Sequence, residues 1–219
     1  MSGASFAAVL VVIGMGVVIG WRTLARRHTL PCPPQFIWLL ENRAMDRVAG
    51  SALLMDRARI LSGMEVLDAG CGPGRLTLPL AERVGEHGSV VAFDLQEGML
   101  ARLKARLEQK GVLNVRPLQG ALGGGALPAG AFDRALLVTV LGEIPDRVSA
   151  LREIRQSLKP GGILSITEVF PDPHYQPRGT VRKLAEQAGF EMCEVFGNWR
   201  AFTLNVARPA QARAPGSSD

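Results

Sequence analysis

Two aspartates on either side of a glycine-rich loop are the residues of this sequence best suited to bind a ligand. Segment 66–77 reads VLDAGCGPGRLT and contains an acid followed by three alternating glycines, Asp68, Gly70, Gly72 and Gly74. Such glycines let the chain turn with positive φ and remove Cβ atoms from a surface that a ligand approaches. Asp94 follows the loop by about 20 residues, where a carboxylate can bind both hydroxyls of a ribose. The pattern predicts a nucleoside-binding site.

The acid that precedes the loop narrows the class of nucleoside. A dinucleotide site normally reads G-x-G-x-x-G and places a helix N-terminus against a pyrophosphate. Here the loop reads Gly-Cys-Gly-Pro-Gly over residues 70–74, directly after Asp68. A carboxylate is a poor neighbour for a pyrophosphate and a good one for an ammonium or a sulfonium group. S-adenosylmethionine carries both of these cations and a ribose, so it is the expected cofactor.

Alternating strand and helix patterns surround these residues and must position them. Strands are expected at 64–70, 89–95, 114–120, 132–140 and 163–169, and helices at 75–84, 97–111, 147–162 and 180–190. A closing pair of strands is expected at 192–198 and 201–208. This alternation predicts a mainly parallel sheet that is covered on both faces. Pro117 cannot donate a hydrogen bond, so the strand that contains it is expected at an edge.

Four motifs in this order resemble the class I S-adenosylmethionine-dependent methyltransferases. They are VLDAGCGPGRLT, VVAFDLQEGML, FDRALLVTVLGEIPD and LREIRQSLKPGGILSITE, and the resemblance covers about residues 60–207. Within that superfamily the chain is most similar to the ubiquinone/menaquinone biosynthesis C-methyltransferase-like and phospholipid N-methyltransferase-like groups. The resemblance implies an α/β, Rossmann-like fold. Its seven-stranded sheet would be mostly parallel, with an antiparallel final strand and helices on both faces.

The resemblance also implies where S-adenosylmethionine binds. It implies cofactor contacts at Asp68, Gly70, Gly72 and Asp94, and the same site is expected to include Cys71, Gly74, Leu95, Met99, Gly120, Ala121 and Thr139. Members of the family commonly carry Gly-Asp-Ala after the third strand, where the acid binds the adenine amino group. This chain reads Gln-Gly-Ala-Leu over residues 119–122. The adenine contact must come from backbone, from a side chain such as Gln119, or be absent. A noncatalytic cofactor-binding scaffold is therefore an alternative to the active enzyme that the other motifs favour.

The methyl acceptor is expected at the carboxyl ends of the fourth and fifth strands. Methyl transfer requires the protein to position the acceptor and, where needed, to remove a proton. Glu143 and Glu168 are candidates at these two strand ends, although capping of the next helix is an alternative role for Glu143. His174 and Tyr175, in the polar loop after the fifth strand, are also predicted catalytic residues because histidine titrates near neutrality. The alternative is a proline-ordered loop in which both merely cap the next helix.

The N-terminal segment predicts a membrane anchor. Residues 1–21 contain no charged side chain, and residues 6–19 are almost wholly apolar. With its flanks this segment approaches the roughly 17–25 residues that a spanning helix needs. Arg22, Arg26 and Arg27 follow at once, which places the rest of the chain in the cytoplasm. The alternatives are a signal peptide and a peripheral hairpin-like segment, but no basic residue precedes the apolar run as it does in a signal peptide. We expect a single-pass membrane protein with a cytoplasmic catalytic domain.

The anchor favours a lipophilic acceptor, because a lipid or quinone-like molecule is concentrated at the bilayer. A small soluble acceptor remains the alternative. The net charge is +5, but the basic residues form no stripe with interleaved aromatic residues. No nucleic-acid partner is therefore expected. The three cysteines are too dispersed for a metal site, and none is expected.

The 219 residues are expected to form one globular domain with appendages. These are an anchor with a basic flank (1–28), a linker with lid-like helices (29–60), a methyltransferase domain (61–208) and a tail that is disordered by composition (209–219).

Overall fold

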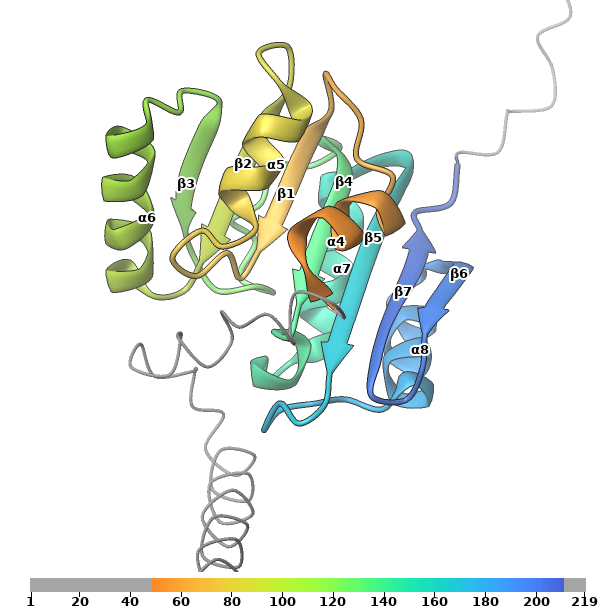
Figure 1. The fold of residues 1–219 in the computed structure, drawn as a ribbon. Helices are drawn as coiled ribbons and strands as arrows, with labels where there is room; N and C mark the ends of the chain where they lie inside the picture. Colours follow the sequence, from red (N-terminus) through yellow and green to blue (C-terminus); the bar gives the residue numbers. More distant parts are fainter. Residues whose placement is uncertain (1–48, 211–219) are drawn as a thin grey trace, which may run out of the picture.

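A single seven-stranded sheet organises residues 49–210, the part of the chain that the computed structural model describes (Figure 1). Its strands are β1 (Glu65–Ala69), β2 (Ser89–Asp94), β3 (Val115–Gln119), β4 (Phe132–Val138), β5 (Leu158–Val169), β6 (Glu191–Gly197) and β7 (Ala201–Ala207). They lie in the order β3-β2-β1-β4-β5-β7-β6. Strands β1 to β5 pair in parallel, whereas β7 is antiparallel to both β5 and β6. The predicted Rossmann-like sheet with an antiparallel final strand is confirmed.

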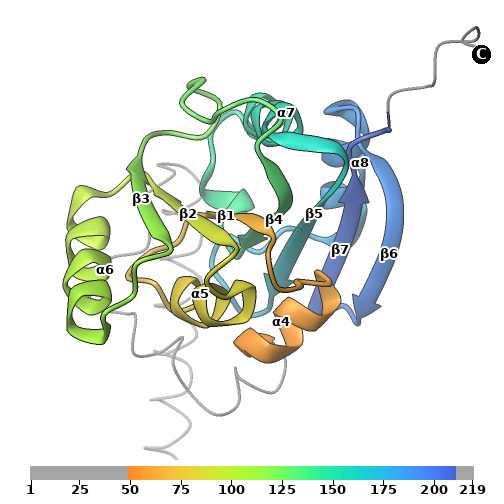
Figure 2. The same cartoon turned by 90° about the horizontal axis from the view of Figure 1, so that it is seen from above.

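Helices cover both faces of this sheet (Figure 2). They are α4 (Ser51–Arg57), α5 (Thr77–Val84), α6 (Glu97–Lys110), α7 (Arg147–Ser157) and α8 (Arg178–Gln187), with a short 3₁₀ helix, η2 (Leu141–Glu143), after β4. One face carries α4, α5 and α6, and the other carries α7 and α8. Strand residues point alternately to the two faces, so Val66 packs with α4 and α5 whereas Leu67 packs with α7 and α8. Central strands buried on both faces are therefore almost wholly apolar.

The predicted helix boundary after α7 is wrong by several residues. A helix was expected over residues 147–162, but α7 ends at Ser157 and β5 begins at Leu158. Leu158 pairs with Phe132 of β4, and the amide of Gly161 donates to the carbonyl of Arg208 at 3.0 Å. These partners extend the strand through the Lys-Pro-Gly-Gly segment, because they satisfy its backbone groups in place of helical bonds. The edge position of β3, which contains Pro117, agrees with the sequence prediction.

The predicted membrane helix, most of the linker and the C-terminal tail lie outside the described residues. Gly50, at the beginning of the described residues, is the N-cap of α4. Between residues 49 and 210, no helix is both long enough and apolar enough to cross a bilayer.

Candidate functional site

The glycine loop after β1 is held against the end of β2. The amides of Gly70 and Cys71 both donate to the carbonyl of Phe93, at 2.7 and 3.0 Å. Gly70 has a φ of 76°, and a Cβ there would lie 2.4 Å from Cγ2 of Val140. Gly72 also has positive φ, at 53°, but no heavy atom of the described residues lies within 4 Å of its Cβ position. Packing therefore requires glycine at position 70, whereas at position 72 the bare backbone faces open space.

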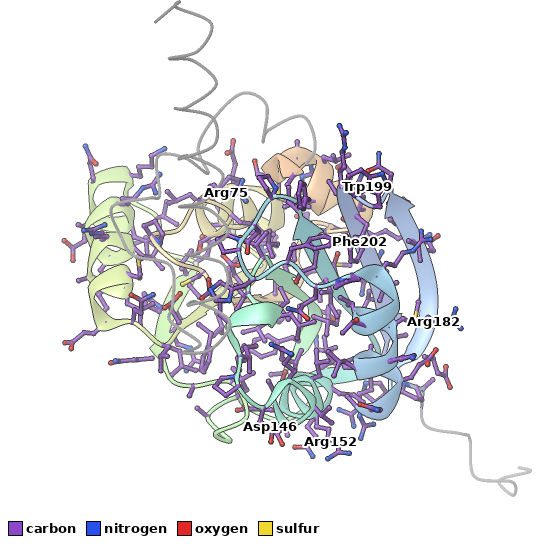
Figure 3. All side chains as sticks on the ribbon, turned by 90° about the horizontal axis from the view of Figure 1, so that it is seen from below. Arg75, Asp146, Arg152, Arg182, Trp199 and Phe202 are labelled. Atoms are coloured by element: carbon purple, nitrogen blue, oxygen red, sulfur yellow. The ribbon has the colours of Figure 1, made fainter. Side chains whose placement is uncertain are left out.

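Asp68 is a buried acid at the carboxyl end of β1. It is 4% exposed, and its Oδ2 accepts a hydrogen bond from the Thr77 hydroxyl at 2.6 Å. Burial raises the pKa of Asp68 to about 6, against the lowering effects of the Thr77 hydroxyl and the Arg75 charge. At neutral pH the carboxyl is therefore ionised and poorly solvated, which suits a cationic ligand group. Figure 3 views this edge of the sheet and labels Arg75 on the side of α4 and α5.

Asp94, at the carboxyl end of β2, is held by backbone amides. Its Oδ2 accepts from the amide of Gly72 and its Oδ1 from the amide of Gln96, both at 2.8 Å. The side chain is buried, so these donors stabilise its charge and fix its orientation. Each carboxylate oxygen keeps a further lone pair, so two ligand hydroxyls can be bound without breaking either bond. This geometry fits the ribose that the sequence predicts here.

The remaining predicted cofactor residues surround these two acids. Met99 and Cys71 are buried, whereas Leu95 is 58% exposed. Burial raises the pKa of the Cys71 thiol, so the thiol stays protonated at neutral pH. The amide of Gly120 donates to the carbonyl of Asp94 at 3.1 Å, which brings the loop after β3 beside the loop after β2. Ala121 follows it and is exposed. Gly74 is also tightly packed, since a Cβ there would lie 2.4 Å from Leu103.

Thr139, directly after β4, has a strained backbone conformation. Its φ is +56°, which is unfavourable for a β-branched residue and costs about 1–3 kcal/mol. The amide of Thr139 donates to the carbonyl of Thr167 at 2.8 Å, so β5 holds this turn in place. The next residue, Val140, is the one that packs against Gly70. The turn therefore links the glycine loop to the end of β5.

The predicted acceptor residues His174 and Tyr175 are both buried in the loop between β5 and α8. The amide of His174 donates to Oδ1 of Asp172 at 2.7 Å. The hydroxyl of Tyr175 donates to the carbonyl of Trp199 at 2.6 Å, so it joins this loop to the β6–β7 turn. A Cβ at Gly142 would lie 1.8 Å from the carbonyl oxygen of His174. Because of this close approach, no side chain larger than that of glycine fits at position 142.

Two glutamates lie at the same edge. Glu143 ends η2 and is half-buried, whereas Glu168 of β5 is 1% exposed. Burial, helped by the Asp172 and Glu143 charges, raises the pKa of Glu168 to about 8, against the lowering effects of the Gln176 amide and Arg147. Within residues 49–210, no group of three His, Cys, Asp or Glu side chains could hold a metal ion.

Two supporting residues did not stand out in the sequence. Thr77 binds Asp68, and the buried Glu153 of α7 accepts the amides of Gly123 and Leu127, which orders the loop after β3. A threonine nine residues after an acid carries no distinctive signal. Glu153 was detectable only as a charged residue on the apolar side of its helix.

Residues 66–162 match the family model of a methyltransferase domain. The chain is 38% identical over 111 residues to the demethylmenaquinone methyltransferase of Lactococcus lactis subsp. lactis, which covers 51% of this chain and 44% of that protein. It is 32% identical over 136 residues to the ubiquinone/menaquinone biosynthesis C-methyltransferase UbiE of Shewanella frigidimarina, covering 62% of this chain and 53% of that protein. The chain thus spans about half the length of these relatives.

A solved structure supports the fold. The SAM dependent methyltransferase from Aquifex aeolicus matches 81% of this chain and 99% of its own, with a TM-score of 0.74 and 24% identity.

Proposed function

We propose that this chain, which carries a methyltransferase domain at residues 66–162 and resembles the class I S-adenosylmethionine-dependent methyltransferases, transfers a methyl group to a lipophilic acceptor. The observation that carries the proposal is the pair Asp68 and Asp94 around an open glycine loop. Asp68 offers a buried negative charge for the ammonium and sulfonium cations, and Asp94 offers oriented oxygens for the ribose. At Gly72 the absent Cβ leaves room for the ligand to approach the backbone. These residues fit S-adenosylmethionine.

The chemistry divides between the cofactor and the chain. S-adenosylmethionine supplies a methyl group that is already activated by the positively charged sulfur. The chain has to hold the two reactants in line and to exclude water, since positioning is the main source of acceleration in such a displacement. Asp68 and Asp94 lie at the ends of adjacent strands and act on the cofactor side. The loops at the ends of β4 and β5 are the nearest elements available on the acceptor side.

The proposed acceptor is a lipid or a quinone-like molecule. The names of the relatives place them in menaquinone and ubiquinone biosynthesis, whose substrates are lipophilic. The uncharged segment 1–21, followed by Arg22, Arg26 and Arg27, supports a single-pass anchor with the domain on the cytoplasmic side. An anchored enzyme meets its acceptor at the bilayer surface, where a lipophilic molecule is concentrated.

A methyl-transfer assay tests the proposal. The purified full-length chain is incubated with methyl-labelled S-adenosylmethionine and a bacterial lipid extract, and the organic and aqueous phases are counted. We expect label in the organic phase. The label should be lost in Asp94→Ala and kept in Asp56→Ala, which changes an exposed acid paired with Arg83. Label found only in the aqueous phase would contradict a lipophilic acceptor. Cofactor binding by calorimetry without any transfer would favour the noncatalytic scaffold.

A further inference from the structure

Glu168 is a buried carboxyl group that the cofactor site does not use. Its Oε2 accepts the amide of Gln176 at 3.0 Å. Its Oε1 is also buried, and among the described residues it has no hydrogen-bond partner. Leaving a buried polar atom without a partner costs about 1–3 kcal/mol, so such exceptions call for a specific explanation. A ligand that donates a hydrogen bond to Oε1 would remove this cost.

The strand register places Glu168 beyond the level of the cofactor residues. Asp68 of β1 pairs with Leu136 of β4, which in turn pairs with Ser165 of β5. Glu168 lies three residues farther along β5, which is roughly 10 Å toward the carboxyl edge. The strained turn at Thr139, whose amide binds the carbonyl of Thr167, lies at the same level. Glu168 therefore lies beyond the level of Asp68, at the carboxyl edge of the sheet where the loops after β4 and β5 meet.

The surroundings of Glu168 suit a group that exchanges a proton. Neighbouring strand residues alternate faces, so Glu168 points to the α7 and α8 face while Thr167 bonds Thr203 on the other. The charged groups that act on it are Arg147 of α7, Glu143 of η2 and Asp172 of the following loop, which also carries His174. Its neighbour on β7 is Phe202. Burial raises the pKa of Glu168 to about 8, close to the working range of a general base.

We propose that Glu168 binds a hydroxyl group of the methyl acceptor through Oε1 and takes its proton during transfer. This inference rests on the proposed methyl transfer and narrows the acceptor to a molecule with an ionisable hydroxyl. As the hydroxyl proton passes to the Glu168 carboxylate, an electron pair of the acceptor forms the bond to the methyl carbon. The bond between that carbon and sulfur breaks, and its electron pair stays on sulfur, which becomes a neutral thioether. The proton then leaves the carboxyl group to solvent.

The variant Glu168→Gln separates this role from a structural one. Its amide oxygen can still accept the Gln176 amide and hold the loop, but its side chain cannot take a proton. The matched control is Glu186→Gln, the same change at an exposed residue of α8 that is paired with Arg182. The probes are reduced 1,4-naphthoquinone, which has hydroxyl groups, and vesicles of phosphatidylethanolamine, which offer an amine. Methylation of each is followed with labelled S-adenosylmethionine across the pH range.

We expect Glu168→Gln to lower kcat on the hydroquinone by about 10²–10⁴-fold, with cofactor affinity unchanged. In the wild type, kcat should rise with pH up to about 8, as Glu168 loses its proton, and this rise should be absent in the variant. The control should behave as the wild type. A Glu168→Gln chain that keeps its kcat and its pH dependence would overturn the proposal. Methylation of phosphatidylethanolamine without methylation of the hydroquinone would also overturn it.

Infrared difference spectroscopy gives a second readout that needs no turnover. The spectrum of the wild type minus Glu168→Gln isolates the carboxyl band of protonated Glu168, which should disappear as the pH rises past about 8. Adding reduced 1,4-naphthoquinone with S-adenosylhomocysteine should shift this band. If the band shifts but no acceptor is methylated, the proposed function fails while the role of Glu168 in hydroxyl binding stands. If the band does not shift when the hydroquinone is added, the inference is overturned whether or not methyl transfer occurs.

Discussion

Replacing Gly72 with alanine separates the stability of the fold from the approach of a ligand. Gly72 has a φ of 53°, and among the described residues nothing lies within 4 Å of the position that its Cβ would take. The cost to the folded chain is therefore that of the left-handed backbone alone, about 1–2 kcal/mol. For a domain of this size, that lowers Tm by roughly 2–8 °C. If the cofactor lies against this backbone, the added methyl group should also weaken binding.

Gly63→Ala is the matched control for this prediction. Gly63 has a φ of 80°, and its Cβ position is equally open within the described part of the chain. It precedes β1, at the opposite edge of the sheet from the glycine loop. Both variants should lose a similar amount of stability, whereas only Gly72→Ala should lose affinity for S-adenosylmethionine. We expect that loss to reach at least about tenfold, which corresponds to about 1.4 kcal/mol.

Two measurements on each chain check this reasoning. Thermal unfolding followed by circular dichroism gives the difference in Tm, and calorimetric titration gives the affinity for S-adenosylmethionine. Gly70→Ala extends the series, because its Cβ would lie 2.4 Å from Val140 and should cost more stability than either open position. Equal cofactor affinity in Gly72→Ala and Gly63→Ala would refute the claim that the loop backbone contacts the cofactor.

Three further predictions concern charge and location. Because Asp68 must be ionised to hold a cation, cofactor affinity should fall as the pH falls through about 6. Thr77→Val removes the hydrogen bond that lowers the pKa of Asp68. In this variant, calorimetry across pH should therefore show the loss of cofactor affinity at a higher pH than in the wild type. Glu168 has a folded-state pKa of about 8, raised from 4.5, so the wild type should lose stability relative to Glu168→Gln as the pH rises between these values, which thermal unfolding can follow. Deleting residues 1–28 should release the chain from membranes at physiological salt, and a deleted chain that still sediments with them would show that another segment or a partner holds it.

The fold was largely predictable from the sequence because its signals are local. Central strands are apolar runs, helices show periodic patterns, and positive φ at the chain turns calls for glycine. The boundary between α7 and β5 was not predictable by the same means. Gly161 and Gly162 normally end a helix, but their backbone partners come from Arg208, far along the chain. Only the folded sheet shows that Leu158 pairs with Phe132.

Candidate site residues could be identified in the sequence where a residue type has few other uses. Asp68 and Asp94 stood out because an acid at the end of an apolar strand is rarely needed for packing, and Gly70 stood out because it begins a run of alternating glycines. Contacts between distant segments carried no such signal. The absence of space for a Cβ at Gly142, next to the His174 carbonyl, depends on how two loops approach each other. Whether the buried Oε1 of Glu168 finds a partner also depends on that packing. Such relations arise only from the packing of the complete domain.

Calorimetric titration of the full-length chain with S-adenosylmethionine tests the central claim most directly. The claim is that Asp94, held by the amides of Gly72 and Gln96, binds this cofactor at the end of β2. We expect binding to one site in the wild type and in Asp56→Ala, and a large loss of affinity in Asp94→Ala. Absence of binding in the wild type, or equal affinity in the two variants, would contradict the account.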